Sequence, residues 1–182
     1  MDMQNATVAL EGRLISKGQQ APDFTLETTA GKRVTLSLIT PLWPVLVIFF
    51  RTRCDACRVL MPRLIKLQHD YGDADIEILA VSQDGKIMTH DFVTDIRWPG
   101  RVLVDHPELE ASKAFGVELL PAAVLVDTDM VVRATADASD LDSFERLTEE
   151  VAALVGWPYK PLLLYDIEPV GPCPSKAMQA IE

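Results

Sequence analysis

The stretch that decides the fold reads VLVIFFRTRCDAC at residues 45–57. Its first six residues are apolar and rich in β-branched and aromatic side chains, which is typical of a strand that is buried on both faces. Its last four residues form a Cys-x-x-Cys pair, Cys54 and Cys57, directly before an amphipathic segment. The pattern predicts a central strand that leads into a helix with both thiols near its start.

The segments around this stretch predict alternating strands and helices. Helices are predicted at residues 57–71, 86–96, 108–115 and from 139 or 140 to 156, the first and the last with one apolar face. Residues 21–37 predict a short N-terminal hairpin around a glycine turn, and further strands are predicted at residues 76–81, 101–105, 122–126 and 131–134. This order favours an α/β fold with a mixed central sheet and helices on both faces.

The same patterns divide the chain into three parts. Residues 1–17 are polar and predict a flexible lead-in or an accessory hairpin, and residues 18–156 form the globular domain. Residues 157–182 form a tail with five prolines, Pro158, Pro161, Pro169, Pro172 and Pro174. Because proline resists helix interiors and central strands, we expect this tail to follow an extended path over the surface.

Composition and charge exclude several classes of function. The chain has 182 residues, 48% of them hydrophobic, and a formal net charge of −10 without any basic run, which argues against partners such as nucleic acid or an anionic membrane surface. No apolar run approaches the roughly 18 residues of a membrane span. Residues 1–18 lack the apolar core of a secretory signal, so we expect a cytoplasmic location.

The Cys-x-x-Cys pair at the start of a helix favours thiol chemistry. Peptide amides and the positive end of the helix dipole stabilise a thiolate, and Arg51, Arg53 and Arg58 are expected to lower the pKa of the first thiol further. The three-residue spacing brings both sulfurs to one face of the helix, within reach of a disulfide. We expect Cys54 to be the exposed, attacking cysteine and Cys57 to resolve the mixed disulfide.

Two structural roles would also suit Cys54 and Cys57, as a pair of core cysteines or as half of a zinc site. The chain has only three cysteines, however, and its histidines, His69, His90 and His106, are isolated in sequence, which disfavours a closed zinc site. The position of the pair between a buried strand and a helix favours the redox interpretation, which requires no cofactor.

Several segments resemble the redoxin branch of the thioredoxin superfamily, in particular thiol-disulfide oxidoreductases of the TlpA and ResA type, which are related to the AhpC/TSA peroxiredoxins. They are GQQAPDFTL at residues 18–26, the segment from Cys54 to Pro62, VSQD at residues 81–84 and FGVELLP at residues 115–121. The resemblance implies a thioredoxin fold and disulfide exchange with a protein or small-thiol partner. It also implies that Pro121 is a cis proline that faces the dithiol and contacts the substrate.

The chain departs from this family at positions that handle protons. Relatives supply a buried carboxylate six residues before the first cysteine or three residues after the second, and this chain has Ile48 and Leu60 there. Without that acid, we expect either slow deprotonation of Cys57 during resolution or another proton acceptor, such as Asp55 or Glu118.

Two alternative functions follow from further departures. A peroxiredoxin-like thiol peroxidase with antioxidant activity is the alternative enzyme class, although Val47 and Arg51 replace the proline and the threonine or serine that precede the peroxidatic cysteine in peroxiredoxins. A non-catalytic interaction or metal-handling module is the other alternative. It is suggested by the missing buried carboxylate, and by Arg53 and Ala56, which replace a tryptophan and a proline common in the family.

The third cysteine, Cys173, lies in the proline-rich tail between Pro172 and Pro174. One interpretation is an idle surface thiol, displayed on an extended loop. The other is the hypothesis that the tail folds back, so that Cys173 pairs with Cys54 or completes a three-thiol metal site.

Overall fold

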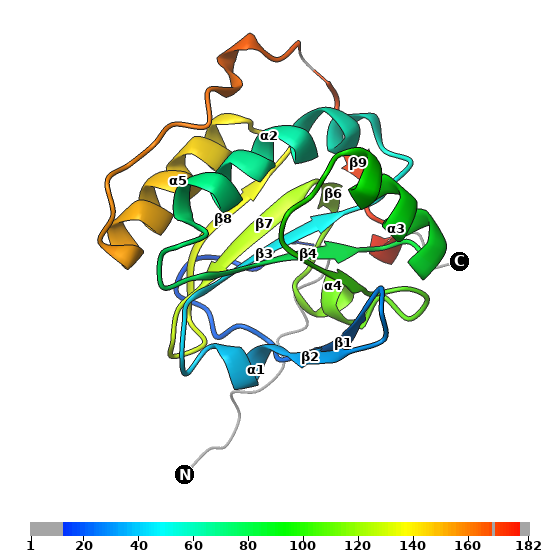
Figure 1. Cartoon of the computed structure of the whole chain (residues 1–182), viewed down its shortest axis with the longest axis horizontal. Coiled ribbons are helices and arrows are strands. Elements are labelled where there is room, and N and C mark those ends of the chain that lie inside the picture. Colours follow the sequence, from blue (N-terminus) through cyan, green and yellow to red (C-terminus); the bar gives the residue numbers. More distant parts are fainter. Residues whose placement is uncertain (1–12, 169, 179–182) are drawn as a thin grey trace.

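The structure, a computed structural model, describes residues 13–168 and 170–178, and its main sheet has seven strands in the order β2-β1-β5-β4-β3-β7-β8 (Figure 1). These strands are β1 (Thr25–Thr28), β2 (Arg33–Thr35), β3 (Val45–Phe50), β4 (Glu77–Ser82), β5 (Arg101–Val104), β7 (Ala122–Val126) and β8 (Val132–Asp137). The helices are α1 (Leu36–Ile39), α2 (Asp55–Tyr71), α3 (Lys86–Asp95), α4 (Glu110–Ala114) and α5 (Asp142–Val155). The predicted α/β fold is confirmed, and each predicted strand and helix has a counterpart.

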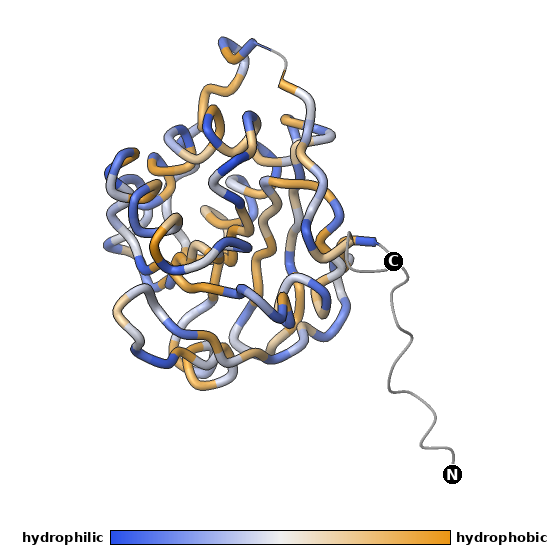
Figure 2. Tube along the Cα trace, turned by 90° about the vertical axis from the view of Figure 1, so that its right-hand side faces the viewer, coloured by the Kyte–Doolittle hydropathy of each residue, from blue (hydrophilic) through white to orange (hydrophobic). Residues whose placement is uncertain are grey.

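The core is built around β3, whose six residues are all buried. β3 pairs in parallel with β4 and antiparallel with β7. Because consecutive strand residues point to opposite faces, the ring of Phe50 stacks on Phe92 of α3, while Phe49 packs against Phe115 beside α4, each at 5.5 Å between ring centroids. Helices α2, α3 and α5 accordingly cover one face of the sheet and α4 the other (Figure 1). Figure 2 shows hydrophobic segments that run through the interior of the domain.

Helix α2 buries one face against the sheet and ends before Gly72, as predicted. Its start lies at the carboxyl end of β3, where the parallel register places Phe50 beside Ser82 of β4. The loops after β3 and β4 therefore leave the sheet at the same edge. The residues after Phe50 and those after Ser82 become neighbours there.

The residues before the hairpin pack against the domain from residue 13 onward. The amide of Ile15 donates a hydrogen bond to the carbonyl of Phe115 (2.9 Å), and the amide of Gly18 donates to that of Val132 (2.8 Å). The predicted lead-in or accessory hairpin falls mostly on residues 1–12, which lie outside the described residues. The division of the chain at residues 17 and 156 stays a prediction.

The tail leaves α5, crosses over α2 and returns to the sheet (Figure 1). The carboxylate of Glu145 in α5 anchors its first part by accepting hydrogen bonds from the amides of Leu162 (2.9 Å) and Leu163 (2.8 Å). The later part contains two short 3-10 turns, η1 (Leu164–Asp166) and η2 (Lys176–Met178), and strand β9 (Cys173–Pro174), which pairs with β6 (Leu119–Leu120). The tail is thus not extended throughout. Among the described helices, none is both long and apolar enough to cross a bilayer.

Candidate active site

Cys54 is the N-cap of α2. Its backbone is extended, with φ −143° and ψ 117°, and its Sγ accepts a hydrogen bond from the amide of Cys57 at 3.2 Å. An N-cap side chain satisfies an amide that has no partner within the helix, and the helix dipole at this end favours negative charge. The helix start is therefore suited to hold Cys54 as a thiolate whenever its sulfur is not bonded.

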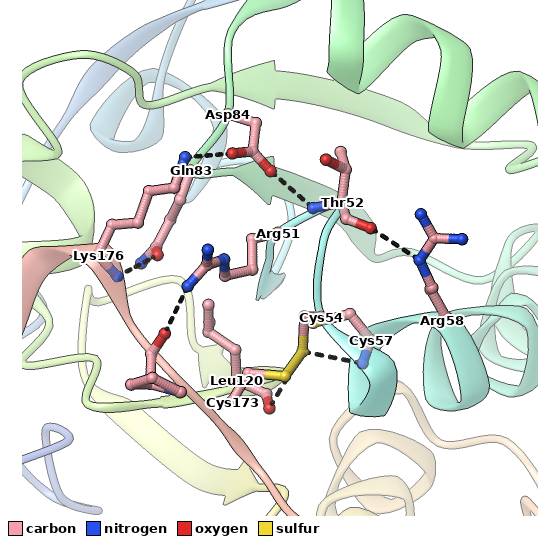
Figure 3. The surroundings of a disulfide bond; sticks show 11 residues. Arg51, Thr52, Cys54, Cys57, Arg58, Gln83, Asp84, Leu120, Cys173 and Lys176 are labelled. Carbon is pink, nitrogen blue, oxygen red and sulfur yellow. Dashed lines mark hydrogen bonds and ion pairs between the residues drawn. A yellow bond between two sulfur atoms is a disulfide. The ribbon is translucent and has the colours of Figure 1, made fainter.

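The sulfur of Cys54 is bonded to Cys173 of the tail, with 5.8 Å between their Cα atoms (Figure 3). The hypothesis that the tail folds back and pairs Cys173 with Cys54 is confirmed. The expectation of an exposed Cys54 is wrong for this form of the chain, because the returning tail leaves only 2% of Cys54 accessible.

Cys57 lies three residues after Cys54 and keeps a free thiol, which is fully buried. Burial raises the pKa of the Cys57 thiol to about 12; a backbone hydrogen bond and the positive charge of Arg51 act against this rise, and the charge of Asp84 adds to it. The thiol is consequently protonated at neutral pH. Its position behind Cys54 is that of a resolving cysteine.

Of the three arginines expected to stabilise a thiolate, only Arg51 is half-buried, and its charge acts on Cys57. Figure 3 shows its guanidinium group directed to the tail. Its Nη1 donates to the carbonyl oxygen of Pro174 at 3.1 Å, and its Nε is buried without a hydrogen-bond partner among the described residues. Arg53 is exposed, and Arg58 is exposed with its Nε donating to the carbonyl of Thr52 at 3.2 Å. The positive charge beside the dithiol therefore comes mainly from Arg51.

The loop before β7 faces the dithiol. The Leu120–Pro121 peptide bond is cis, as the family resemblance implied, and the carbonyl oxygen of Leu120 lies 4.0 Å from Sγ of Cys54. The structure thus brings Cys54, Cys57 and Pro121 together. The contact of Pro121 with a substrate stays a prediction.

A buried acid that the sequence did not single out lies beside the dithiol. Asp84 is 2% exposed; its carboxylate accepts a hydrogen bond from the amide of Thr52 at 2.6 Å and pairs with the ammonium group of Lys176. Burial alone would raise the pKa of Asp84, but the bonds from Lys176 and Thr52 hold it below its ordinary value. By contrast, Asp55 is exposed and Glu118 is half-buried. The signal was the segment VSQD at residues 81–84, which begins in the last two residues of β4, the strand parallel to β3.

A dithiol at the start of a helix, beside a cis-proline loop and on a sheet of this order, defines a redoxin of the thioredoxin fold. Within that class the chain belongs to the AhpC/TSA family, whose model matches residues 17–135. The match includes Cys54, Cys57 and Pro121 and ends before the tail that carries Cys173.

The chain is similar to curated proteins from Bacillus subtilis. It is 30% identical over 125 residues to the thioredoxin-like protein YneN, and this alignment covers 65% of this chain and 70% of YneN. It is also 30% identical over 116 residues to the thiol-disulfide oxidoreductase ResA, and this alignment covers 63% of this chain and 64% of ResA. The chain thus spans slightly less than two thirds of the length of ResA.

Solved structures show the same fold. A putative thiol:disulfide interchange protein DsbE from Chlorobium tepidum superposes with a TM-score of 0.69 at 26% identity, covering 78% of this chain and 99% of that protein. A putative protein disulfide isomerase from Bacteroides thetaiotaomicron gives a TM-score of 0.69 at 23% identity, covering 80% of this chain and 93% of that protein.

Proposed function

We propose that this chain is a thiol-disulfide oxidoreductase that exchanges disulfides with a protein or a small thiol through Cys54 and Cys57. The observation that carries the proposal is the bond between Cys54 and Cys173. It is the type of linkage that an exchange enzyme forms with its substrate, and the free thiol of Cys57 lies one helical turn behind it.

In the direction of reduction, the Cys54 thiolate attacks one sulfur of the substrate disulfide. A bond forms between Cys54 and that sulfur, the substrate S–S bond breaks, and the departing sulfur leaves as a thiolate that takes up a proton. The Cys57 thiolate then attacks Sγ of Cys54, which closes a Cys54–Cys57 disulfide and releases the second substrate thiolate. In the direction of oxidation, the same steps run in reverse.

The site divides these tasks between its groups. The amide of Cys57, which donates to Sγ of Cys54 in the structure, stabilises the attacking thiolate and the charge that returns to Cys54. Arg51 favours ionisation of Cys57, while burial and the carboxylate of Asp84 disfavour it. Deprotonation of Cys57 is therefore the demanding part of the second step.

The reduction of a protein disulfide such as that of insulin, with dithiothreitol as the source of electrons, tests the proposal. The full chain is expected to accelerate reduction. Cys54→Ser should abolish the acceleration. Cys57→Ser combined with Cys173→Ser should accumulate a mixed disulfide in the absence of dithiothreitol, which mass spectrometry detects. Equal rates with the wild-type chain and Cys54→Ser would instead favour the non-catalytic interaction or metal-handling module. Peroxide consumption, measured with the same variants, tests the antioxidant alternative.

The cytoplasmic location is also a proposal, and it determines which redox form prevails. Cytoplasmic thiols would reduce the Cys54–Cys173 bond and keep the site open, whereas an oxidising compartment would preserve the bond. Cell fractionation with alkylation of free thiols at lysis tests both the location of the chain and the redox form of its cysteines. Recovery of the chain in an extracytoplasmic fraction would overturn this location.

A further inference from the structure

The end of the tail lies in the active site as a bound peptide would. Strand β9 runs antiparallel to β6, so that Cys173 lies opposite Leu120 and Pro174 opposite Leu119. β6 directly precedes Pro121. The backbone of the tail is thus paired with the loop that faces the dithiol, in addition to the bond between Cys173 and Cys54.

The two residues that follow Pro174 are held mainly by Gln83. Its Nε2 donates to the hydroxyl oxygen of Ser175 at 2.7 Å, and its Oε1 accepts from the amide of Lys176 at 2.8 Å. The amide of Ser175 donates to the carbonyl of Glu118 at 2.7 Å. The residue two positions after Cys173 is therefore recognised through both its hydroxyl and its backbone.

Charged groups fix the positions on either side. The ammonium of Lys176, three positions after Cys173, pairs with the buried carboxylate of Asp84 (Figure 3). The carbonyl of Pro174 accepts a hydrogen bond from Arg51 at 3.1 Å. One acidic and one basic side chain of the domain thus contact the tail within a few residues of the disulfide.

Gln83 and Asp84 are covered in the form of the chain in which the tail is bound. Gln83 is 0% exposed and Asp84 is 2% exposed. Within the described residues, both side-chain hydrogen bonds of Gln83 go to the tail. Departure of the tail removes both hydrogen-bond partners of Gln83 and the ion-pair partner of Asp84, so a second segment that supplies the same groups can take its place.

We propose that residues 173–176 occupy, within their own chain, the binding site for a partner polypeptide. Gln83 and Asp84 then select partner segments that carry a hydroxyl side chain two positions after the reacting cysteine and a lysine three positions after it. This inference rests on the proposed function and names its substrate class as an extended Cys-x-Ser-Lys segment.

The exchange of the tail for a partner needs no outside oxidant. Cys57 first gives its proton to water. Its thiolate attacks Sγ of Cys54, the Cys54–Cys57 bond forms, the Cys54–Cys173 bond breaks, and Cys173 leaves as a thiolate that takes up a proton from water. The thiolate of the partner then attacks Sγ of Cys54. A bond forms between Cys54 and the partner, the Cys54–Cys57 bond breaks, and Cys57 takes up a proton.

Synthetic peptides test the selectivity without changing the protein. The full chain with Cys57→Ser and Cys173→Ser keeps Cys54 as its sole thiol, so mixed disulfides accumulate. The reference peptide is Gly-Pro-Cys-Pro-Ser-Lys-Ala, the sequence of residues 171–177. Its equilibrium constant for pairing with Cys54, measured against glutathione, is compared with the constants of peptides in which glutamate replaces lysine or alanine replaces serine.

We expect the glutamate peptide to pair at least about tenfold more weakly and the alanine peptide about threefold more weakly than the reference. Equal constants for all three peptides, or pairing of glutathione alone, would overturn the selectivity while leaving the proposed function intact. If neither glutathione nor any peptide pairs with Cys54, the proposed function fails as well.

Variants of the protein provide the matched comparison. Asp84→Asn should reduce the preference for the lysine peptide over the glutamate peptide to a few-fold, because the partner of the ammonium group loses its charge. Asp91→Asn changes an exposed acid on α3 and should leave the preference unchanged. A preference that is the same in Asp84→Asn as in the parent would assign the lysine subsite to other residues.

Discussion

The buried thiol of Cys57 controls the step that resolves a mixed disulfide. Since its pKa is raised to about 12, the thiolate fraction should grow with pH throughout the range in which the protein is studied. The rate at which Cys57 displaces glutathione from Cys54 in the Cys173→Ser chain should rise about tenfold per unit between about pH 6 and 10. Stopped-flow measurement of glutathione release checks this, and a plateau near pH 8.5, where a free cysteine ionises, would contradict it.

Arg51 is the basic residue that favours ionisation of Cys57. Arg51→Met should therefore raise the pKa of Cys57 further and slow the same release by up to about tenfold, because Arg51 is half-buried and its charge is partly screened. Arg51→Lys should retain most of the rate. Arg53→Met, which removes an exposed charge from the same loop, is the control and should have little effect.

Helix α2 depends on Cys54 as its N-cap as well as for chemistry. In the Cys173→Ser background, the additional change Cys54→Ala should lower the free energy of unfolding by about 1 kcal/mol relative to Cys54→Ser, because serine can still accept a hydrogen bond from the amide of Cys57. Urea denaturation under reducing conditions measures the difference. Equal stabilities would show that this cap contributes nothing.

The elements were predictable wherever their signal is local. The six apolar residues of β3 and the apolar stripe of α2 lie within single segments, so the sequence pattern predicted both with small errors at the ends. Asp84 was not predicted as part of the site, because its proximity to Thr52 depends on the parallel register of β3 and β4. A sequence search for a buried acid near the cysteines along the chain misses a residue supplied by the neighbouring strand.

For the whole molecule, the Cys54–Cys173 bond joins residues 119 positions apart and ties the tail to the domain. Reduction of the wild-type chain should lower its free energy of unfolding by about 2–5 kcal/mol, because the closed loop restricts the unfolded state. Thermal unfolding with and without dithiothreitol measures this loss. In Cys173→Ala the reductant should have a smaller effect on stability, since a Cys54–Cys57 ring closes a far shorter loop. An effect as large as in the wild type would show that the Cys54–Cys173 bond is not the source of the stabilisation.

The destination of the tail was only partly predictable. The prolines indicated that residues 157–182 do not continue the helices of the domain. Pairing of Cys173 with Cys54 was one of three interpretations, beside an idle surface thiol and a three-thiol metal site. The contacts of Gln83 and Asp84 with the tail join residues more than 90 positions apart, and no local pattern encodes them. For the same reason, the sequence suggested an exposed Cys54, whereas the tail covers it.

The long separation between the bonded cysteines has a practical consequence for work in cells. Denatured in detergent, a chain closed between residues 54 and 173 is a large covalent loop with a smaller hydrodynamic size than the open chain, so it should migrate faster on a non-reducing gel. A Cys54–Cys57 ring barely changes that size and would comigrate with the fully reduced chain until free thiols receive a bulky maleimide. Electrophoresis of samples quenched in acid would therefore report how much of the cellular pool holds its tail in the closed position.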